Sequence, residues 1–175
     1  MRKGILLVLL LALISCKEDK STNNAQDVDA DDSYKVKLDI VDYYGLEEIL
    51  KREDDKTYIV NFWATWCAPC VKELPYFEKL DKEYEDEKVE VVLVSLDFPK
   101  KYETKLIPFI KKHQLRSELV ALNDMDSNYW IPKVEENWSG AIPATLIFNK
   151  EKRQFYEQTF HYDELETEIQ KFLKK

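Results

Sequence analysis

Two cysteines separated by two residues form a pair whose type and spacing could carry covalent chemistry. Cys67 and Cys70 lie in the segment WATWCAPC, residues 63–70, between an expected buried strand and an expected helix. The unpaired N–H groups and the dipole at the start of a helix favour an anion, so they would stabilise the thiolate of Cys67. Cys70 follows one turn later, where it could attack a mixed disulfide on Cys67 and release the other partner as a dithiol. We therefore expect thiol–disulfide exchange with Cys67 as nucleophile and Cys70 as resolving cysteine.

Other uses of such a pair fit these residues less well. A structural zinc site needs two further ligands, and the sequence offers only His113, His161 and the distant Cys16. Covalent haem attachment needs a histidine directly after the second cysteine, and Val71 stands there instead. A chemically inert buried pair remains as the simplest alternative. No metal, and no cofactor other than the redox-active dithiol, is expected.

The first residues of the chain have the pattern of an export signal. Two basic residues precede an unbroken apolar run at residues 5–14, which is too short to cross a bilayer as a helix. The run ends in Leu-Ile-Ser-Cys at residues 13–16, which resembles a bacterial lipobox. Residues 1–15 are therefore predicted to be a lipoprotein signal peptide, and Cys16 is predicted to be lipidated. An ordinary secretory signal that contains a cysteine is the alternative.

Residues 16–33 are expected to form the lipidated cysteine and a flexible acidic tether. They contain too few apolar side chains to offset the entropy lost on ordering. The protein is thus expected on the extracytoplasmic side of a bacterial membrane, held there by its lipid. Lys17 is not the aspartate that retains many lipoproteins at the inner membrane, so placement on the outer membrane or the cell surface is left open.

The composition suits one globular domain, predicted here at residues 34–175. The 175 residues are 45% hydrophobic and carry 26 basic and 34 acidic side chains, a net charge of −8. Nucleic-acid binding is not expected, because such proteins normally present a basic surface. Strands that alternate with helices, followed by a hairpin and a last helix, predict an α/β layered sheet. The expected strands lie at about 36–40, 57–63, 90–96, 119–122, 144–148 and 153–158, the expected helices at about 46–50, 68–86, 102–114 and 162–173, and an irregular or weakly helical segment at 126–138.

The segment VNFWATWCAPC, residues 60–70, resembles the active-site strand and motif of the thioredoxin superfamily, and of its TlpA/ResA group in particular. Pro75 matches the proline within the active-site helix, and residues 140–145, GAIPAT, match the loop that holds a cis-proline opposite the dithiol. The resemblance covers residues 34–175. It implies a thioredoxin-like fold with a central mixed sheet flanked by helices. The long interval between the motif and the cis-proline fits the extra strand and helix of this group.

The resemblance also implies a substrate-binding loop. Pro143 would follow a cis peptide bond, which would leave the backbone of Ile142 free to pair with an extended substrate peptide. Trp66 would form part of the substrate platform, while Trp63 is expected in the core.

A second set of implied roles concerns protons. Asn61 stands where cytosolic thioredoxin carries a buried acid, so that proton shuttle is expected to be missing. Glu73 falls where the ResA group carries a glutamate near its active site, and we expect it to assist proton movement at the Cys70 thiol. The alternative is a glutamate placed early in a helix because the helix dipole favours it there.

The implied function is an extracytoplasmic thiol-disulfide oxidoreductase that reduces disulfides in exported proteins, apocytochrome c among the candidates. The dipeptide between the cysteines, Ala68-Pro69, supplies no cation, so only a moderately lowered Cys67 pKa is expected. This predicts a reductant or a weak isomerase, with a potential toward the thioredoxin end of the scale. A membrane electron donor of the DsbD or CcdA kind would regenerate the dithiol, and the chain is expected to act as a monomer. Two alternatives remain. One is a thiol peroxidase of the same fold, although residues 64–67 lack the proline of the peroxidatic motif, and the other is a redox-inactive surface binding module.

Overall fold

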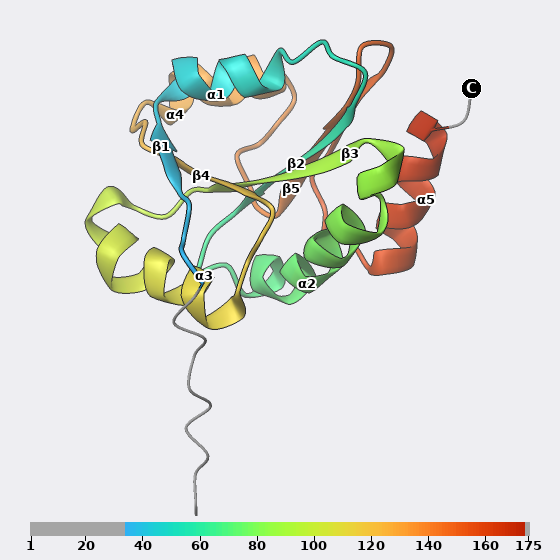
Figure 1. The fold of residues 1–175 in the computed structure, drawn as a ribbon. Helices are drawn as coiled ribbons and strands as arrows, with labels where there is room; N and C mark the ends of the chain where they lie inside the picture. Colours follow the sequence, from blue (N-terminus) through green and yellow to red (C-terminus); the bar gives the residue numbers. More distant parts are fainter. Residues whose placement is uncertain (1–33, 174–175) are drawn as a thin grey trace, which may run out of the picture.

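A mixed six-stranded sheet forms the centre of the protein in a computed structural model that describes residues 34–173 (Figure 1). The predicted signal peptide, Cys16 and the tether lie outside the described residues. The strand order is β1-β4-β3-β2-β5-β6, with parallel pairing from β1 to β2 and antiparallel pairing of β5 with β2 and with β6. The strands are β1 (Asp39–Val41), β2 (Thr57–Trp63), β3 (Val89–Ser95), β4 (Glu118–Leu122), β5 (Ala144–Phe148) and β6 (Arg153–Tyr156).

Helices cover both faces of this sheet. Helices α1 and α4 lie on one face, and α2, α3 and α5 lie on the other (Figure 1). The α-helices are α1 (Tyr43–Leu50), α2 (Ala68–Glu83), α3 (Ile107–His113), α4 (Ser127–Val134) and α5 (Tyr162–Leu173). Two 3-10 turns, η1 (Glu85–Glu87) and η2 (Pro99–Lys101), and a π-helical turn, η3 (Tyr102–Leu106), complete the regular structure.

The central strand β2 is buried along its whole length, because helices pack on both of its faces. Its side chains alternate between the two layers: Tyr58 and Phe62 contact the layer of α1 and α4, whereas Ile59 and Trp63 contact the layer of α2, α3 and α5. Such a strand needs apolar residues at nearly every position, which explains why its bounds could be predicted from composition. Thr57 at the start of this strand and Asn61 at its middle are the polar exceptions.

The parallel strands bring four loops to one edge of the sheet. The carboxyl ends of β1, β4, β3 and β2 all point the same way, and the antiparallel strand β5 begins at that same edge. In open α/β sheets this edge is where ligands and reactive groups gather. The segment after β2 and the segment before β5 therefore meet there, which is the arrangement that the cysteine motif and Pro143 require.

Most predicted elements are confirmed, with three corrections. The first strand is shorter than predicted and starts at Asp39, because only Asp39–Val41 find ladder partners on β4. The predicted helix at 102–114 is divided into η3 and α3, and Pro108 lies in the first turn of α3, where a missing N–H costs little. Residues 126–138 contain a true helix, α4, whose start is capped by the side chain of Asp126. The interval between α2 and Pro143 holds β3, α3, β4 and α4, in agreement with the expected insertion.

Candidate active site

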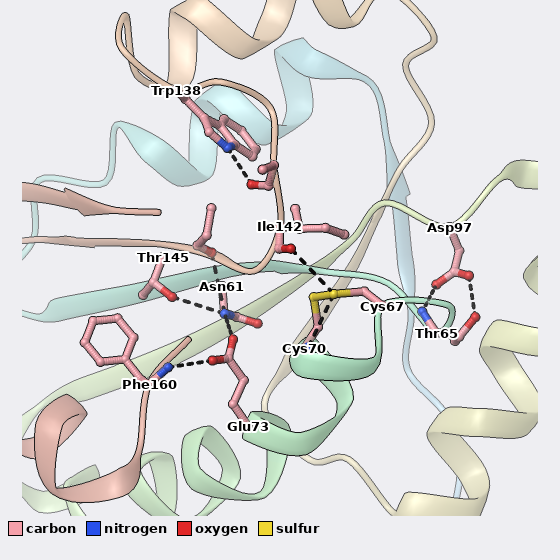
Figure 2. The surroundings of a disulfide bond; sticks show 12 residues. Asn61, Thr65, Cys67, Cys70, Glu73, Asp97, Trp138, Ile142, Thr145 and Phe160 are labelled. Atoms are coloured by element: carbon pink, nitrogen blue, oxygen red, sulfur yellow. Dashed lines mark hydrogen bonds between the residues drawn. A yellow bond between two sulfur atoms is a disulfide. The ribbon is translucent and has the colours of Figure 1, made fainter. Parts of the chain in front are cut away.

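Cys67 and Cys70 form a disulfide at the start of α2 (Figure 2). Cys67 is the N-cap residue of the helix, and its Sγ accepts a hydrogen bond from the backbone N–H of Cys70 at 3.3 Å. Cys67 keeps 6% of its surface exposed, whereas Cys70 is fully buried. A partner can therefore reach Cys67 before Cys70, as the assignment of nucleophile and resolving cysteine requires. The same cap would offer N–H groups to the thiolate once the disulfide is reduced.

The loop before β5 closes over the disulfide. The peptide bond between Ile142 and Pro143 is cis, and the Sγ of Cys67 lies 3.7 Å from the carbonyl oxygen of Ile142. Trp66, directly before Cys67, is 59% exposed, while Trp63 is fully buried. The structure thus brings Cys67, Cys70 and the Ile142–Pro143 step together, as predicted, and leaves an exposed aromatic ring on the residue that precedes the nucleophile.

Trp138 holds this loop in place. Its indole Nε1 donates to the carbonyl oxygen of Ala141 at 2.8 Å (Figure 2). Its ring packs on Phe62 with 4.8 Å between centroids. Gly140 adopts a φ of 89°, a left-handed conformation that favours glycine, and lets the chain turn between Trp138 and the loop. Trp138 ends the segment predicted to be irregular or weakly helical, and no local pattern indicates this role for it.

Replacing Trp138 with Phe is expected to lower the free energy of unfolding by about 1–2 kcal/mol, because a smaller ring fills the site and the Ala141 carbonyl loses its donor. Urea unfolding monitored by circular dichroism measures the change. Trp66→Phe is the matched control, since that ring is exposed, and it should change stability by less than about 0.5 kcal/mol. Equal losses in both variants would contradict the assigned role of Trp138.

Glu73 is a fully buried carboxyl group one turn after Cys70 in α2. Its Oε1 accepts from Nδ2 of Asn61 at 3.0 Å, and its Oε2 accepts from the backbone N–H of Phe160 at 2.9 Å (Figure 2). Burial raises the pKa of Glu73 to about 7, against the lowering effect of these two hydrogen bonds. Its bonds link α2 to β2 and to the segment before α5. The alternative of a glutamate placed early in the helix by the dipole does not account for a carboxyl group held inside the protein.

Asn61 connects this carboxyl group to the strand that follows Pro143. Besides Glu73, its Nδ2 lies 3.1 Å from Oγ1 of Thr145 on β5, while its Oδ1 finds no hydrogen-bond partner among the described residues. Asn61 was identified from the sequence as the residue that replaces the buried acid of cytosolic thioredoxin. Its contact with Glu73 was not predicted. The signal was present, because Asn61 and Glu73 are polar residues at inward-facing positions of neighbouring elements.

A further buried acid, Asp97, was not predicted. It follows β3, and its carboxylate accepts hydrogen bonds from Thr65 in the turn before Cys67 (Figure 2). The turn itself is closed by the N–H of Cys67, which donates to the carbonyl oxygen of Ala64 at 3.1 Å. An acid directly after an apolar strand was the available signal, since parallel strands end at the same edge as the reactive pair.

Residues 34–173 contain no cluster of three His, Cys, Asp or Glu side chains placed to hold a metal ion. Within the same range, no helix combines the length and the apolar character needed to span a membrane.

Comparison with known proteins connects this geometry to a family. Residues 24–153 match the AhpC/TSA family. A thiol-disulfide oxidoreductase ResA of Oceanobacillus iheyensis is 32% identical over 158 residues, which cover 81% of each chain. A second protein of that name, from Bacillus thuringiensis subsp. konkukian, is 27% identical over 136 residues, covering 78% of this chain and 72% of the relative.

Solved structures agree on the fold. The crystal structure of a secreted thiol-disulfide isomerase from Corynebacterium glutamicum superposes with a TM-score of 0.59 at 15% identity, over 74% of this chain and 75% of the other. The fold, the cysteine pair at the start of α2 and the ResA relatives lead to one assignment. The chain belongs to the AhpC/TSA family and is a thioredoxin-like thiol-disulfide oxidoreductase with a Cys67–Cys70 pair.

Proposed function

We propose that the protein reduces disulfides in exported proteins outside the cytoplasm. The observation that carries the proposal is the position of Cys67. Its sulfur lies at a helix start, beside the Ile142 carbonyl and after the exposed Trp66, on a residue that keeps 6% of its surface exposed while Cys70 keeps none. A substrate disulfide could approach this sulfur along the loop, with its backbone beside Ile142 and Pro143. The redox-inactive binding module is disfavoured, because an unused pair would not need this access.

The proposed cycle begins with both cysteines reduced. The Cys67 thiolate attacks one sulfur of the substrate disulfide, forms a mixed disulfide and releases the other substrate sulfur as a thiolate. The Cys70 thiolate then attacks the Cys67 sulfur, which restores the Cys67–Cys70 disulfide and releases the second substrate thiolate. The substrate gains two electrons and two protons, and the protein loses them. The described structure corresponds to the oxidised end of this cycle.

Glu73 is proposed to take up the proton that Cys70 must lose. A group with a pKa of about 7 exchanges protons readily near neutral pH, and Glu73 lies one turn from Cys70 on the same helix. Asn61 and the Phe160 N–H would hold its carboxyl group in place during the transfer.

The reducing direction is argued from what surrounds Cys67. Ala68 and Pro69 place no cation between the cysteines, so the thiolate would gain only the stabilisation of the helix start. We therefore expect a reduction potential near that of thioredoxin, about −270 mV, rather than that of DsbA, about −120 mV. Equilibration with glutathione buffers measures it. A value near the DsbA end would reverse the proposed direction.

Replacing Cys70 with Ser is expected to trap substrates. Cys67 could still attack, but no second sulfur would resolve the mixed disulfide, so stable adducts should accumulate in cells. Non-reducing gels followed by mass spectrometry identify them, and Cys67→Ser is the control in which the adducts should be absent. Adducts on apocytochrome c would single out that substrate, whereas a broad set would indicate general reduction. Adducts that persist without Cys67 would contradict the assignment of the nucleophile.

We further propose where the protein is attached and which membrane protein re-reduces it. The lipobox-like segment supports attachment through a lipid on Cys16, and a membrane electron donor of the DsbD or CcdA kind would re-reduce a protein that acts as a monomer. Cys16→Ser in the full chain should move the protein from the membrane fraction to the soluble fraction. A variant that stays with the membrane would overturn the lipid anchor.

A peroxide-consumption assay separates the reductase from the thiol peroxidase of the same fold.

A further inference from the structure

Asp97 makes an unusual set of contacts beside the reactive pair. It is 2% exposed, and its carboxylate accepts three hydrogen bonds, of which Figure 2 shows the two from Thr65. The Thr65 N–H donates to Oδ2 at 2.9 Å, the Thr65 hydroxyl donates to Oδ1 at 2.5 Å, and the Ser95 hydroxyl donates to Oδ2 at 3.0 Å. All three partners are donors, so the contacts suit the ionised carboxylate, which only accepts.

The fold explains why Asp97 reaches this turn. Strands β2 and β3 are parallel neighbours, and Trp63 lies opposite Ser95 at their carboxyl ends. The N–H of Leu96 also donates to the carbonyl oxygen of Trp63 at 2.8 Å, which extends the pairing beyond the strands. Asp97 therefore leaves β3 directly beside the turn that leaves β2. Because Thr65 is held at both its N–H and its hydroxyl, the turn that ends at Cys67 has little freedom.

The charge of Asp97 is not paired with a cationic side chain of the described residues. None of the ion pairs between residues 34 and 173 includes Asp97. Asp97 places a buried negative charge against Thr65, two residues before Cys67. That charge opposes a second negative charge on the Cys67 sulfur, and the opposition is stronger inside a protein than in water. The disulfide carries no charge, so only the reduced form is penalised.

We propose that Asp97 is a positioning residue for Cys67 that fixes the Ala64–Cys67 turn and, through its uncompensated charge, biases the pair toward the disulfide. The protein is thereby made a stronger reductant, because a couple that favours its oxidised form gives electrons more readily. This inference deepens the proposed reductase function, and its role in the cell rests on that function. The effect of Asp97 on the dithiol–disulfide equilibrium of Cys67 and Cys70 can be measured independently of any substrate.

The test separates the charge from the hydrogen bonds. In Asp97→Asn the side chain keeps its shape: Oδ1 can accept from the Thr65 N–H and Ser95, and Nδ2 can donate to the Thr65 hydroxyl, which both donates and accepts. In Asp97→Ala both the charge and the hydrogen bonds are lost. The matched control is Asp126→Asn, because Asp126 is an acid after β4 whose capping bond to Tyr129 an asparagine can also make.

Two measurements on the purified protein decide the outcome. Equilibration with glutathione should show Asp97→Asn shifted about tenfold toward the dithiol, since the variant removes a buried charge that repels the Cys67 thiolate. Tenfold corresponds to a potential about 30 mV less negative. The pH profile of Cys67 alkylation should move to lower pH in the same variant. Asp126→Asn should stay within twofold of the wild type in both.

Each result supports or overturns the proposal. Asp97→Ala should also shift the equilibrium toward the dithiol, and it should add a loss of thermal stability that Asp97→Asn lacks. An Asp97→Asn protein within twofold of the wild type in equilibrium and alkylation overturns the charge effect, even if Asp97→Ala fails to fold. A shift of equal size in Asp126→Asn overturns its specificity. If the potentials shift as expected while the wild type reduces no protein disulfide, the proposed function fails and the inference about Asp97 stands.

Discussion

Replacing Cys67 with Ser is expected to reduce the rate of insulin reduction by about a thousandfold or more, to the rate of the reducing buffer alone. The hydroxyl of serine is not ionised near neutral pH, so the helix start has no thiolate to stabilise, and no mixed disulfide can form. The turbidity of precipitating insulin B chain, followed in the presence of a small dithiol, measures the rate.

The variant should keep its fold, because a serine at the N-cap position can still accept the N–H of Cys70. A circular dichroism spectrum and a melting temperature close to those of the reduced wild type are the control for this point. If a folded Cys67→Ser protein still reduces insulin, another group must act as the nucleophile, and the assignment of Cys67 would be wrong.

Replacing Glu73 with Gln is expected to stabilise the folded protein at pH 8 by about 3–4 kcal/mol and to have little effect at pH 4. The folded protein holds this proton with a pKa of about 7, against an ordinary value of 4.5. Between these values the folded state binds more protons than the unfolded state, so stability falls as the pH rises, and the whole penalty is present above pH 7. Each pKa unit is worth about 1.4 kcal/mol, and the variant escapes the penalty because glutamine has no charge to bury.

Urea unfolding of the oxidised proteins at pH 4 and pH 8 measures the difference. Other groups also titrate over this range, so the quantity to compare is the difference between variant and wild type at each pH. Glu103→Gln is the matched control, because Glu103 is an exposed glutamate, and it should change stability by less than about 0.5 kcal/mol at either pH. A Glu73→Gln protein that is less stable by the same amount at both pH values would show that the hydrogen bonds from Asn61 and Phe160 keep the group ionised.

The parts of the protein that could be predicted from sequence are those determined by local patterns. Thr57–Trp63, Ala144–Phe148 and Tyr162–Leu173 have the predicted bounds, because a buried strand and an amphipathic helix impose strong periodicity on their residues. The site at Cys67 and Cys70 was predictable for a similar reason, since a strand, a turn and a helix start are contiguous in the chain.

Contacts between distant segments were not predictable in the same way. Asp97 and Thr65 are 32 positions apart, and nothing in the local sequence of either indicates the other. Helix α4 was underestimated because Pro132 lies inside it, while its stability comes from Trp130 and Val134, which pack into the core. The role of Trp138 depends on the loop before β5, whose path is set by the whole sheet.

Asn61 gives the interior a way to follow changes at the reactive pair without moving its backbone. The oxygen and the NH2 group of its amide are similar in size. Nδ2 donates to Glu73, while Oδ1 has no hydrogen-bond partner among the described residues. A rotation of the Asn61 amide by 180° about its terminal side-chain bond would exchange Oδ1 and Nδ2. Oδ1 could then accept a hydrogen bond from the Glu73 carboxyl group once that group is protonated. A rigid centre of this kind can therefore alternate between two patterns of donors and acceptors while every strand and helix around it stays still.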